Sequence, residues 1–409
     1  MQNQFEKLGI DEDFTPLYRE MGIRQPNEVQ CEVIPKILKS QSLICVAQTG
    51  SGKTLSYALP ISEMIKLIED EQGLSENLGS PRAVVVVPTK ELALQITDVF
   101  KRISHHAKLR VRSLITTKSL KSQGFEVLVS TPSKLSQALK KKDVSFNDLK
   151  YLVFDEADQL FDMGFKRDIE GIIRFVEFSE TDIHFFSATM PNDVKSFLEE
   201  KFQKKKLKSI LIGGAHKAQQ RIETFNLNVK PEEKLYALEA FIKKSAQGRG
   251  IVFVNQKNQV EEVNKYLAER LPKLKFRMLH GDLPEKERIQ SIRSFMQNKS
   301  HVLVASDVAA RGMDIKDLDW VLNFGLPKSP IYYLHRCGRT GRAGRAGKVF
   351  NFVTSYDSKL IAQINQSIKE QSHIDIGTID DKSKREKARK VAGKPKKVKR
   401  LKITKRSRH

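Results

Sequence analysis

Cysteine is scarce in this chain of 409 residues, which contains only Cys31, Cys45 and Cys337. Their odd number and scattered positions match neither a disulfide framework nor a zinc site, so we expect a reducing, cytoplasmic compartment. Long hydrophobic runs are also missing, and none approaches the roughly 20 residues of a membrane helix. The first residues, MQNQFEKLGIDEDF, contain neither the basic nor the apolar region of a signal peptide. We therefore expect no membrane association.

Acidic residues are outnumbered, with 49 Asp and Glu against 72 Lys and Arg, and the formal net charge is +23. Residues 382–409 hold fifteen Lys and Arg and one Glu, which is +14 of that total and leaves +9 for the rest of the chain. A basic excess in both parts predicts a polyanionic partner such as a nucleic acid. The end of the chain, 377–409, has too little apolar surface to fold, and we predict a disordered tail. That tail is interpreted as an arm that neutralises phosphates, a solubilising segment, or a nuclear or nucleolar address.

Short apolar runs rich in β-branched residues alternate with helix-length segments in two stretches of the chain. The runs are 43–47, 83–88, 127–131, 151–157 and 183–189 in the first stretch, and 224–229, 250–255, 301–306, 320–324 and 348–353 in the second. Continuous apolar runs are typical of parallel strands that are buried on both faces. We predict two α/β domains, each a mainly parallel sheet flanked by helices, at 1–208 and 222–376, with a linker at 209–221 and the tail at 377–409.

The segment AQTGSGKT, residues 47–54, follows an apolar run and precedes a segment with helical periodicity. It fits the phosphate-loop pattern G-x-x-x-x-G-K-[ST] except that Ala47 stands at the first glycine. Glycines let backbone N–H groups close around phosphate oxygens, and the helix start adds its positive dipole end. Lys53 would reach the β- and γ-phosphates, and Thr54 would bind Mg²⁺. The loop residues predicted to hold ATP are Ala47, Gln48, Thr49, Gly50, Ser51, Gly52, Lys53 and Thr54. The alternative is a plain strand–turn–helix connection.

A second motif, YLVFDEAD at 151–158, ends a buried strand with carboxylates. A carboxylate in that position is costly unless a cation is near, so Asp155 is predicted to hold Mg²⁺ through water. Glu156 is predicted to orient and deprotonate the attacking water. The alternative is that both acids only stabilise a helix N-terminus.

The residues Asp155-Glu156-Ala157-Asp158 spell the signature of the DEAD-box RNA helicases of superfamily two. Further segments resemble that family's motifs in order: PTKELALQ (88–95), TPSKL (131–135), Ser187-Ala188-Thr189, IVFVNQK (251–257), LHGDLPEKER (279–288), VASDVAARGMDI (304–315) and HRCGRTGR (335–342). The chain resembles the family over about residues 5–355, and its compact core with a short basic tail is similar to bacterial members. The resemblance implies two tandem RecA-like domains that bind ATP, Mg²⁺ and RNA.

The resemblance also implies roles for single residues. Phe5 would stack on adenine, and Gln30, whose amide both donates and accepts, would read the adenine edge. Asp314 would contact the ribose, and Arg339 and Arg342 would act as arginine fingers on the γ-phosphate. The residues implied to couple the nucleotide site to domain closure are Asp158, Ser187, Thr189, Arg311 and His335. The residues implied to bind RNA are Pro88, Thr89, Lys90, Glu91, Thr131, Pro132, Arg288 and Ser306. The positions that depart from the family pattern are Ile23, Asn27, Lys90, Ser133, Lys134, Glu285 and Ser306.

The function implied is RNA-stimulated ATP hydrolysis coupled to local, non-processive unwinding of RNA duplexes or remodelling of RNA–protein complexes. We expect a monomeric core that acts in ribosome assembly or RNA turnover, with ribosomal precursors or RNA-decay proteins as partners. One alternative is another superfamily-two motor such as a DNA helicase, against which Gln30 and the residues 155–158 argue. A second alternative is an ATP-gated RNA clamp, against which Lys53 and Glu156 argue together with the two arginines.

Overall fold

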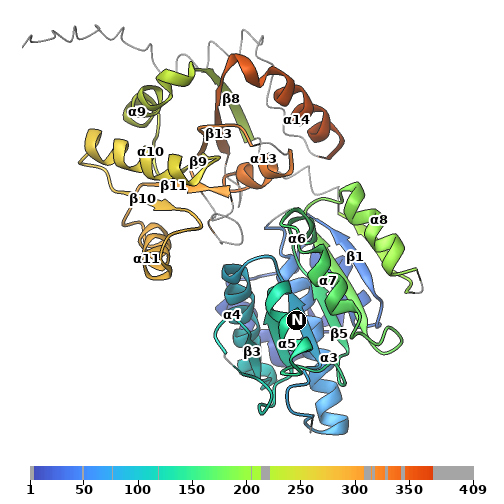
Figure 1. Ribbon diagram of the computed structural model, residues 1–409. Helices are drawn as coiled ribbons and strands as arrows, with labels where there is room; N and C mark the ends of the chain where they lie inside the picture. The colour runs from blue at the N-terminus through green and yellow to red at the C-terminus, as the bar shows by residue number, and fades with distance from the viewer. Residues whose placement is uncertain are drawn as a thin grey trace, which may run out of the picture. The chain divides into compact units, whose positions relative to one another are not determined.

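A computed structural model of the chain divides into two compact units, residues 1–218 with 311–314 and the remainder (Figure 1). The structure describes residues 4–47, 50–75, 77–117, 119–203, 205–212, 222–307, 315, 318–327, 330–341 and 346–371. The predicted site residues that lie outside these ranges are Gln48, Thr49, Arg311, Asp314 and Arg342. The predicted tail 377–409 lies outside them as well.

The first unit is built on a parallel seven-stranded sheet in the order β3-β4-β2-β5-β6-β1-β7. Its strands are β1 (Leu43–Val46), β2 (Ala83–Val86), β3 (Val111–Ser113), β4 (Val127–Ser130), β5 (Tyr151–Phe154), β6 (Asp182–Ser187) and β7 (Lys208–Leu211). Its helices are α1 (Thr15–Glu20), α2 (Glu28–Ile37), α3 (Lys53–Gln72), α4 (Lys90–Ala107), α5 (Pro132–Lys140), α6 (Ala157–Asp162), α7 (Lys166–Ile173) and α8 (Asn192–Lys201), with single turns at Glu6–Leu8 and Glu12–Phe14.

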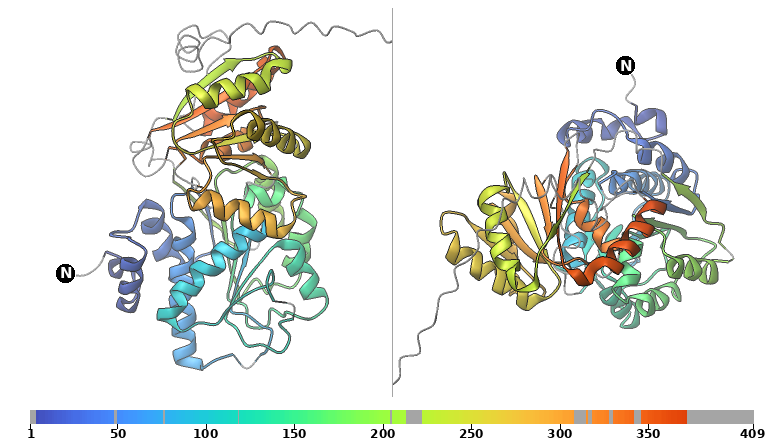
Figure 2. Two further views of the ribbon diagram at one scale, coloured as in Figure 1. Left: turned by 90° about the vertical axis from the view of Figure 1, so that its left-hand side faces the viewer. Right: turned by 90° about the horizontal axis from the view of Figure 1, so that it is seen from above.

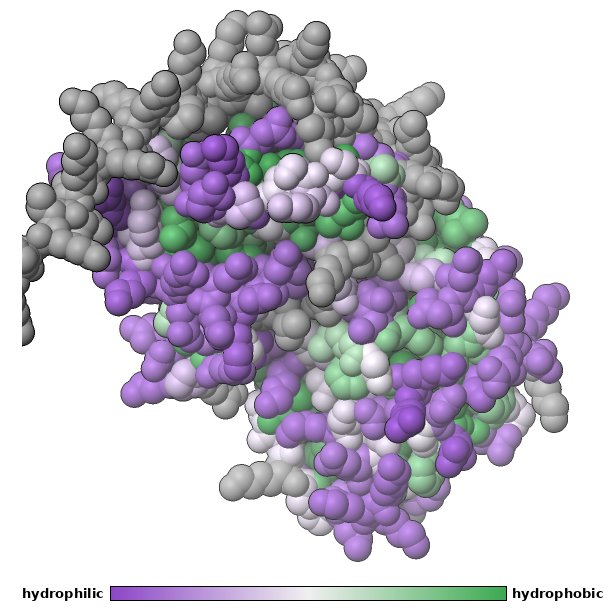
Figure 3. Space-filling view, turned by 45° about the horizontal axis from the view of Figure 1, so that its top comes forward, coloured by the Kyte–Doolittle hydropathy of each residue, from purple (hydrophilic) through white to green (hydrophobic). Residues whose placement is uncertain are grey.

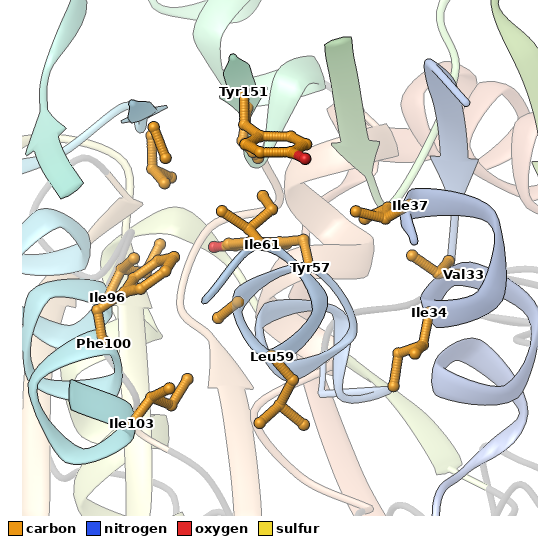
Figure 4. Packing of buried hydrophobic residues seen from close by; sticks show 14 of the residues in the cluster. Val33, Ile34, Ile37, Tyr57, Leu59, Ile61, Ile96, Phe100, Ile103 and Tyr151 are labelled. Carbon is orange, nitrogen blue, oxygen red and sulfur yellow. The ribbon is translucent and has the colours of Figure 1, made fainter. Parts of the chain in front are cut away.

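Helices cover both faces of this sheet because successive strand residues point to opposite sides. In β2, Val85 joins the core formed with α2, α3 and α4, whereas Val84 and Val86 join the core formed with α5, α6, α7 and α8. Figure 4 shows the first of these cores, where Tyr57 and Ile61 of α3 lie among the side chains of its neighbours α2 and α4. Because both faces are covered, the central strands read as continuous apolar runs.

The second unit has a parallel six-stranded sheet in the order β10-β11-β9-β12-β13-β8. Figure 2 shows the elements of this unit in colours from yellow-green to red. Its strands are β8 (Ile222–Asn228), β9 (Gly250–Val254), β10 (Phe276–Leu279), β11 (Val302–Ser306), β12 (Trp320–Asn323) and β13 (Gly347–Val353). Its helices are α9 (Lys234–Lys244), α10 (Lys257–Arg270), α11 (Glu285–Met296), α13 (Pro330–Cys337) and α14 (Ser358–Gln371), with single turns at Pro231–Glu233 and Ser355–Asp357. Two parallel sheets flanked by helices confirm the predicted fold class.

Each strand expected from the sequence is present within a few residues of its predicted range, but three further strands are not among those predicted. These are β3, β7 and β10, and each forms an edge of its sheet. β7 pairs with β1, so the first sheet extends to Leu211, three residues into the segment 209–221 that the sequence analysis assigned to the linker. β7 was not predicted because its sequence, KSIL, is short and begins with a charged residue, as is common in edge strands.

Polar side chains dominate the described surface in the view of Figure 3, with hydrophobic residues mostly between them. Among the helices that the structure describes, none combines the length and the apolar character needed to cross a membrane.

A buried histidine on β6 makes the stability of the first unit dependent on pH. His184 is fully buried, and neither ring nitrogen has a hydrogen-bond partner among the described residues. Burial, with a smaller contribution from Lys205, lowers the pKa of His184 from 6.5 to about 3. The folded unit therefore binds fewer protons than the unfolded chain, so its stability is complete above pH 6.5 and is lost as the pH falls from 6.5 towards 3.

When the pH falls from 7 to 5, we expect the free energy of unfolding to drop by about 2 kcal/mol more in wild type than in His184→Leu. Hydrogen exchange of β6 peptides at the two pH values measures this difference for the first unit alone. His105→Leu, at an exposed position of α4, should keep the wild-type pH dependence. Equal pH dependence in His184→Leu and wild type would show that the imidazole takes up a proton as readily in the folded unit as in the unfolded chain.

Candidate functional site

The predicted ATP and RNA motifs follow strands whose carboxyl ends meet at one edge of the first sheet. The phosphate loop follows β1, Ser187 ends β6 and Asp155 follows β5, and these strands are neighbours in the order β1-β6-β5. β2 and β4 come next in the sheet, and they lead into Thr89 and Thr131. The topology thus places both sets of residues along the edge where open α/β sheets bind ligands.

The described part of the phosphate loop closes against the segment that was predicted to read adenine. Gly50 and Gly52 have positive φ angles of 80° and 85°, which favour glycine. A Cβ atom on Gly52 would also lie 2.3 Å from Asn27 Nδ2 and 2.9 Å from Gln30 Nε2. Ser51 and Gly52 lead directly into α3, so the loop ends at a helix N-terminus that can hold an anion.

Lys53, in the first turn of α3, links the loop to the acidic motif. Its ammonium donates a hydrogen bond of 2.8 Å to the carbonyl of Ala47 and lies 3.9 Å from Glu156 Oε1. Ala47 N–H in turn donates to the carbonyl of Ser187 at 2.9 Å, which ties the start of the loop to β6. The loop, the lysine and the acidic pair therefore form one connected site.

Asp155 is buried at the end of β5, with 3% of its surface exposed. Its Oδ2 accepts a hydrogen bond from the Tyr57 hydroxyl at 2.9 Å, and its Oδ1 accepts from Glu156 N–H at 2.8 Å. Burial, and next the charge of Glu156, raise the pKa of Asp155 to about 7, although Lys53 and these hydrogen bonds oppose the rise. A cation would remove this cost, because it favours the ionised carboxylate.

Glu156 is the more accessible of the two acids, with 15% of its side chain exposed. It begins α6 in the left-handed backbone conformation, with φ and ψ both 51°, which is uncommon for a residue with a side chain. Its Oε2 accepts a hydrogen bond of 3.3 Å from Gln159 Nε2. A carboxylate that is held in place but reaches solvent is suited to act as a general base on water, which agrees with its predicted role.

The residues predicted to bind Mg²⁺ fit that ion. Thr54 follows Lys53 in the first turn of α3, one turn before Tyr57, whose hydroxyl donates a hydrogen bond to Asp155. Among the described residues, no group of three or more His, Cys, Asp or Glu side chains could hold a metal ion alone. One carboxylate and one hydroxyl suit Mg²⁺, which takes its other ligands from phosphates and water.

The three described residues predicted to couple the motifs in the first unit contact one another. Asp158 is fully buried, and its Oδ2 accepts hydrogen bonds from Thr189 N–H at 3.0 Å and Thr189 Oγ1 at 2.7 Å. Asp158 N–H donates to Ser187 Oγ at 3.1 Å. The end of β6 is thereby fixed to α6, the helix that Glu156 begins.

The two residues predicted to contact adenine are occupied in protein contacts. Gln30 and Asn27 form a reciprocal cap at the start of α2: each side chain accepts a 3.0 Å hydrogen bond from the backbone N–H of the other. Asn27, a departure from the family pattern, thus serves as a helix cap. The Phe5 ring is fully buried and stacks on Tyr18, with ring centroids 4.1 Å apart. Stacking of Phe5 on a base would require this ring to become exposed.

The residues of the first unit that were predicted to bind RNA lie at two helix N-termini. Thr89 caps α4, and its hydroxyl accepts a hydrogen bond of 3.2 Å from Leu92 N–H. Thr131 is the N-cap residue of α5 but makes no side-chain capping hydrogen bond, and Pro132 begins this helix after the neighbouring strand β4. Pro88 and Thr89 are buried, whereas Lys90 is exposed and Glu91 is partly exposed in the first turn of α4. Two positive helix ends beside each other suit a chain of phosphates.

Two departures in α5 have structural roles. Ser133 Oγ donates a hydrogen bond of 2.7 Å to Asp168 Oδ2 on α7, and Lys134 Nζ donates to the carbonyl of Leu114 at 3.3 Å. These contacts hold α5 against the rest of the unit.

Arg336 organises the second unit, although the sequence analysis gave this residue of HRCGRTGR no role of its own. It is 1% exposed, and all five of its N–H groups find acceptors. Nε and Nη2 donate to the two oxygens of Asp307 at 2.5 and 2.6 Å. Nη1 donates to Asn323 Oδ1 and to the carbonyl of Gly325, each at 2.8 Å. The second proton of Nη2 is donated to Asn255 Oδ1 at 2.9 Å. A sequence signal existed: Asn255, Asp307 and Asn323 are polar residues at the carboxyl ends of three neighbouring apolar strands.

The other described residues predicted in the second unit lie on α13 or just after it, at the end of β11, and on α11. His335 is buried on α13, and Arg339 is half-buried just after that helix, with its backbone carbonyl accepting from Leu318 N–H at 3.2 Å. Ser306 is buried at the end of β11, and Arg288 is partly exposed on α11. The structure therefore fixes the backbone that leads to Arg339.

Comparisons with known proteins agree with this site. Residues 27–197 match the DEAD/DEAH box helicase domain, and residues 233–344 match the helicase conserved C-terminal domain. The structure of S. cerevisiae Dbp5 bound to RNA and ADP BeF3 is similar with a TM-score of 0.78 at 25% identity, covering 96% of this chain and 100% of that one.

Two relatives match most of the sequence. DEAD-box ATP-dependent RNA helicase 39 of Arabidopsis thaliana is 32% identical over 396 residues, covering 92% of this chain, and the chain spans 63% of that protein's length. The DEAD-box ATP-dependent RNA helicase RhpA of Helicobacter pylori is 33% identical over 384 residues, which cover 92% of this chain and 75% of that protein. Since this identity extends through both units, the chain belongs to the DEAD-box ATP-dependent RNA helicase family.

Proposed function

We propose that the chain hydrolyses ATP in response to RNA and uses the cycle to separate short RNA duplexes or remodel RNA–protein complexes locally. The observation that carries this proposal is the first sheet's carboxyl edge. There, the phosphate loop, Lys53 and the pair Asp155 and Glu156 are joined by close contacts, and they lie beside the helix N-termini that follow β2 and β4.

The hydrolysis step follows from the chemistry of these groups. The loop N–H groups and Lys53 hold the phosphates, and Glu156 accepts a proton from water as the water oxygen attacks the γ-phosphorus and the bond to ADP breaks. Mg²⁺, held by Thr54 and Asp155, would neutralise charge on the β- and γ-phosphates. Arg339 and Arg342 are proposed to stabilise the charge on the transferred phosphoryl group.

RNA binding is proposed to use phosphate and 2′-hydroxyl contacts, which are independent of base sequence. The exposed Lys90 and the α4 and α5 N-termini offer positive charge, and Arg288 and Ser306 are the candidates on the second unit. The structures of Dbp5 and of Mss116p bound to ssRNA and AMP-PNP support this choice of ligand. The basic segment 377–409 would add affinity that falls with salt.

Hydrolysis is proposed to be gated by closure of the two units on ATP and RNA. The hydrogen bonds that join Asp158 to Ser187 and Thr189 would transmit the state of the nucleotide site, because they tie the helix that Glu156 begins to the end of β6. Return to the open state after hydrolysis would release the RNA.

The proposed setting is cytoplasmic, with ribosomal precursors or RNA-decay assemblies as the substrates and a monomeric core. The basic excess outside 382–409 and the family to which the chain belongs support an RNA partner of this kind. Crosslinking of the cellular protein to RNA, followed by sequencing of the bound fragments, tests this setting. Recovery of fragments with no rRNA or mRNA among them would contradict it.

ATP turnover measured with single-stranded RNA, with DNA of the same sequence and with neither tests the activity. We expect stimulation by RNA alone, and a loss of about 10²-fold in kcat/KM for Lys53→Ala, because the phosphates lose their cation. Lys195→Ala, which removes an exposed lysine from α8, is the control and should match wild type. Stimulation by DNA alone would indicate a DNA motor, and a stable RNA complex without turnover would indicate a clamp.

A further inference from the structure

One fully buried tyrosine in the first unit contacts the carboxylate that is proposed to bind Mg²⁺. Tyr57 is on α3, one turn after Thr54, and its Oη donates a hydrogen bond of 2.9 Å to Asp155 Oδ2. We infer that Tyr57 is a positioning residue that orients the Mg²⁺-binding carboxylate of Asp155 through its hydroxyl.

The direction of this hydrogen bond suits a metal site. Because Tyr57 Oη donates its only proton to Oδ2, it favours the ionised form of Asp155. The remaining lone pairs of the carboxylate stay available for a cation. Hydrogen bonds from outer residues to the ligands of a metal commonly fix those ligands in their binding orientation.

The ring of Tyr57 is itself held firmly. It packs against Phe186 of β6 and Phe100 of α4, with ring centroids 4.9 and 6.4 Å away. Figure 4 shows Tyr57 within this cluster, between α3 and α4. A ring packed in this way keeps its hydroxyl at one point, so Asp155 is held against α3, the helix that begins at Lys53, although 98 positions separate Tyr57 from Asp155 in the sequence.

The burial of Asp155 makes this orientation important. An ionised carboxylate with 3% exposure has little water to solvate it, so it depends on donors such as Tyr57. Without the hydroxyl, the carboxylate loses one of its two described hydrogen bonds and is free to rotate out of its binding orientation. We expect the cation, rather than the nucleotide itself, to be bound less tightly.

The test uses the full chain with Tyr57→Phe, which removes one oxygen and keeps the ring. ADP binding is measured by calorimetry in EDTA and at a series of Mg²⁺ concentrations, and thermal unfolding is recorded for each variant. We expect unchanged ADP affinity in EDTA, and a rise of about tenfold in the Mg²⁺ concentration that gives half of the full increase in affinity. ATP turnover should fall at limiting Mg²⁺ and recover at high Mg²⁺.

Two further variants separate the hydroxyl from the packing. Tyr151→Phe removes the hydroxyl from a buried tyrosine at the other end of β5 and should match wild type in its Mg²⁺ requirement. Tyr57→Leu lacks the ring as well; it should unfold at lower temperature but share the Mg²⁺ requirement of Tyr57→Phe.

The outcomes distinguish this role from the proposed ATPase activity on which it rests. A wild-type Mg²⁺ requirement in Tyr57→Phe would overturn the role of Tyr57 alone. So would an equal loss of ADP affinity with and without Mg²⁺, since that would assign Tyr57 to the phosphate loop. If the wild-type chain bound no ADP at any Mg²⁺ concentration, the proposed function would fail as well.

Discussion

Replacing Glu156 with glutamine is expected to lower the kcat of RNA-stimulated ATP hydrolysis by ~10²–10⁴-fold. The amide cannot accept the proton of the attacking water, whereas it keeps the size of the side chain and its position at the start of α6. Lys53, 3.9 Å away, also loses a negative neighbour, so ATP should bind at least as well as in wild type. Single-turnover hydrolysis and ATP binding at equilibrium, measured on the same preparation, separate the two effects.

Glu180→Gln is the matched control for this substitution. Glu180 lies in the same unit and pairs with Lys150 at 3.1 Å, but its side chain is 64% exposed and the pair lies at the other end of the strands. Its loss should leave turnover unchanged, since exposed pairs contribute little. If Glu156→Gln hydrolysed ATP within a factor of about three of wild type, another group would have to serve as the base.

Much of the fold could be predicted because the central strands are buried on both faces. Runs such as 83–86 and 151–154 are apolar throughout, and each is followed by a motif. The sequence therefore indicates both the strand and the candidate site residues at its carboxyl end. The strands that were missed are edges. β3, β7 and β10 contain Arg112, Lys208 and Arg277, and charges of this kind interrupt the apolar pattern while protecting an exposed edge from pairing.

Residues that separate short motifs single out lie together in the structure. Lys53 lies near Glu156, and the backbone of Glu156 contacts Asp155, because the strand order places β5 near β1. The family pattern implied the same residues. Tyr57 was missed because its contact with Asp155 spans 98 positions and a tyrosine inside an apolar helix face is typical of a core residue. Phe5 illustrates the reverse case, since its position in the motif does not reveal that its ring is covered by Tyr18.

The sequence analysis also did not distinguish Arg336 from the two arginines that follow it, for a physical reason. Three arginines at equal spacing are alike in charge, and only burial distinguishes the one whose five N–H groups are all satisfied. Its guanidinium lies 5.0 Å from the centre of the Phe253 ring, which completes its burial. The fork geometry of arginine lets a single side chain bind three strand ends and a loop carbonyl, so lysine could not replace it.

Arg336→Met is therefore expected to destabilise the second unit by about 3–5 kcal/mol, because it leaves Asp307 without its cation and Asn255 and Asn323 without a donor. Hydrogen exchange of peptides from β9, β11 and β12 should become faster, whereas peptides from β1 and β5 in the first unit should exchange as in wild type. Since a change of this size is a large fraction of the stability of a domain, the thermal transition of the second unit should fall by roughly 10 °C.

Two companion variants decide whether the effect comes from the buried network. Lys257→Met removes a cation from an exposed pair with Asp282, whose side chains are 58% and 62% exposed, and should cost less than about 1 kcal/mol. Adding Asp307→Leu to Arg336→Met removes the uncompensated charge, so the double variant should recover about 1–2 kcal/mol of the loss. If the double variant were less stable than Arg336→Met alone, the carboxylate of Asp307 would be satisfied independently of Arg336. The arginine would then stabilise the unit through Asn255, Asn323 and its packing on Phe253 rather than through charge.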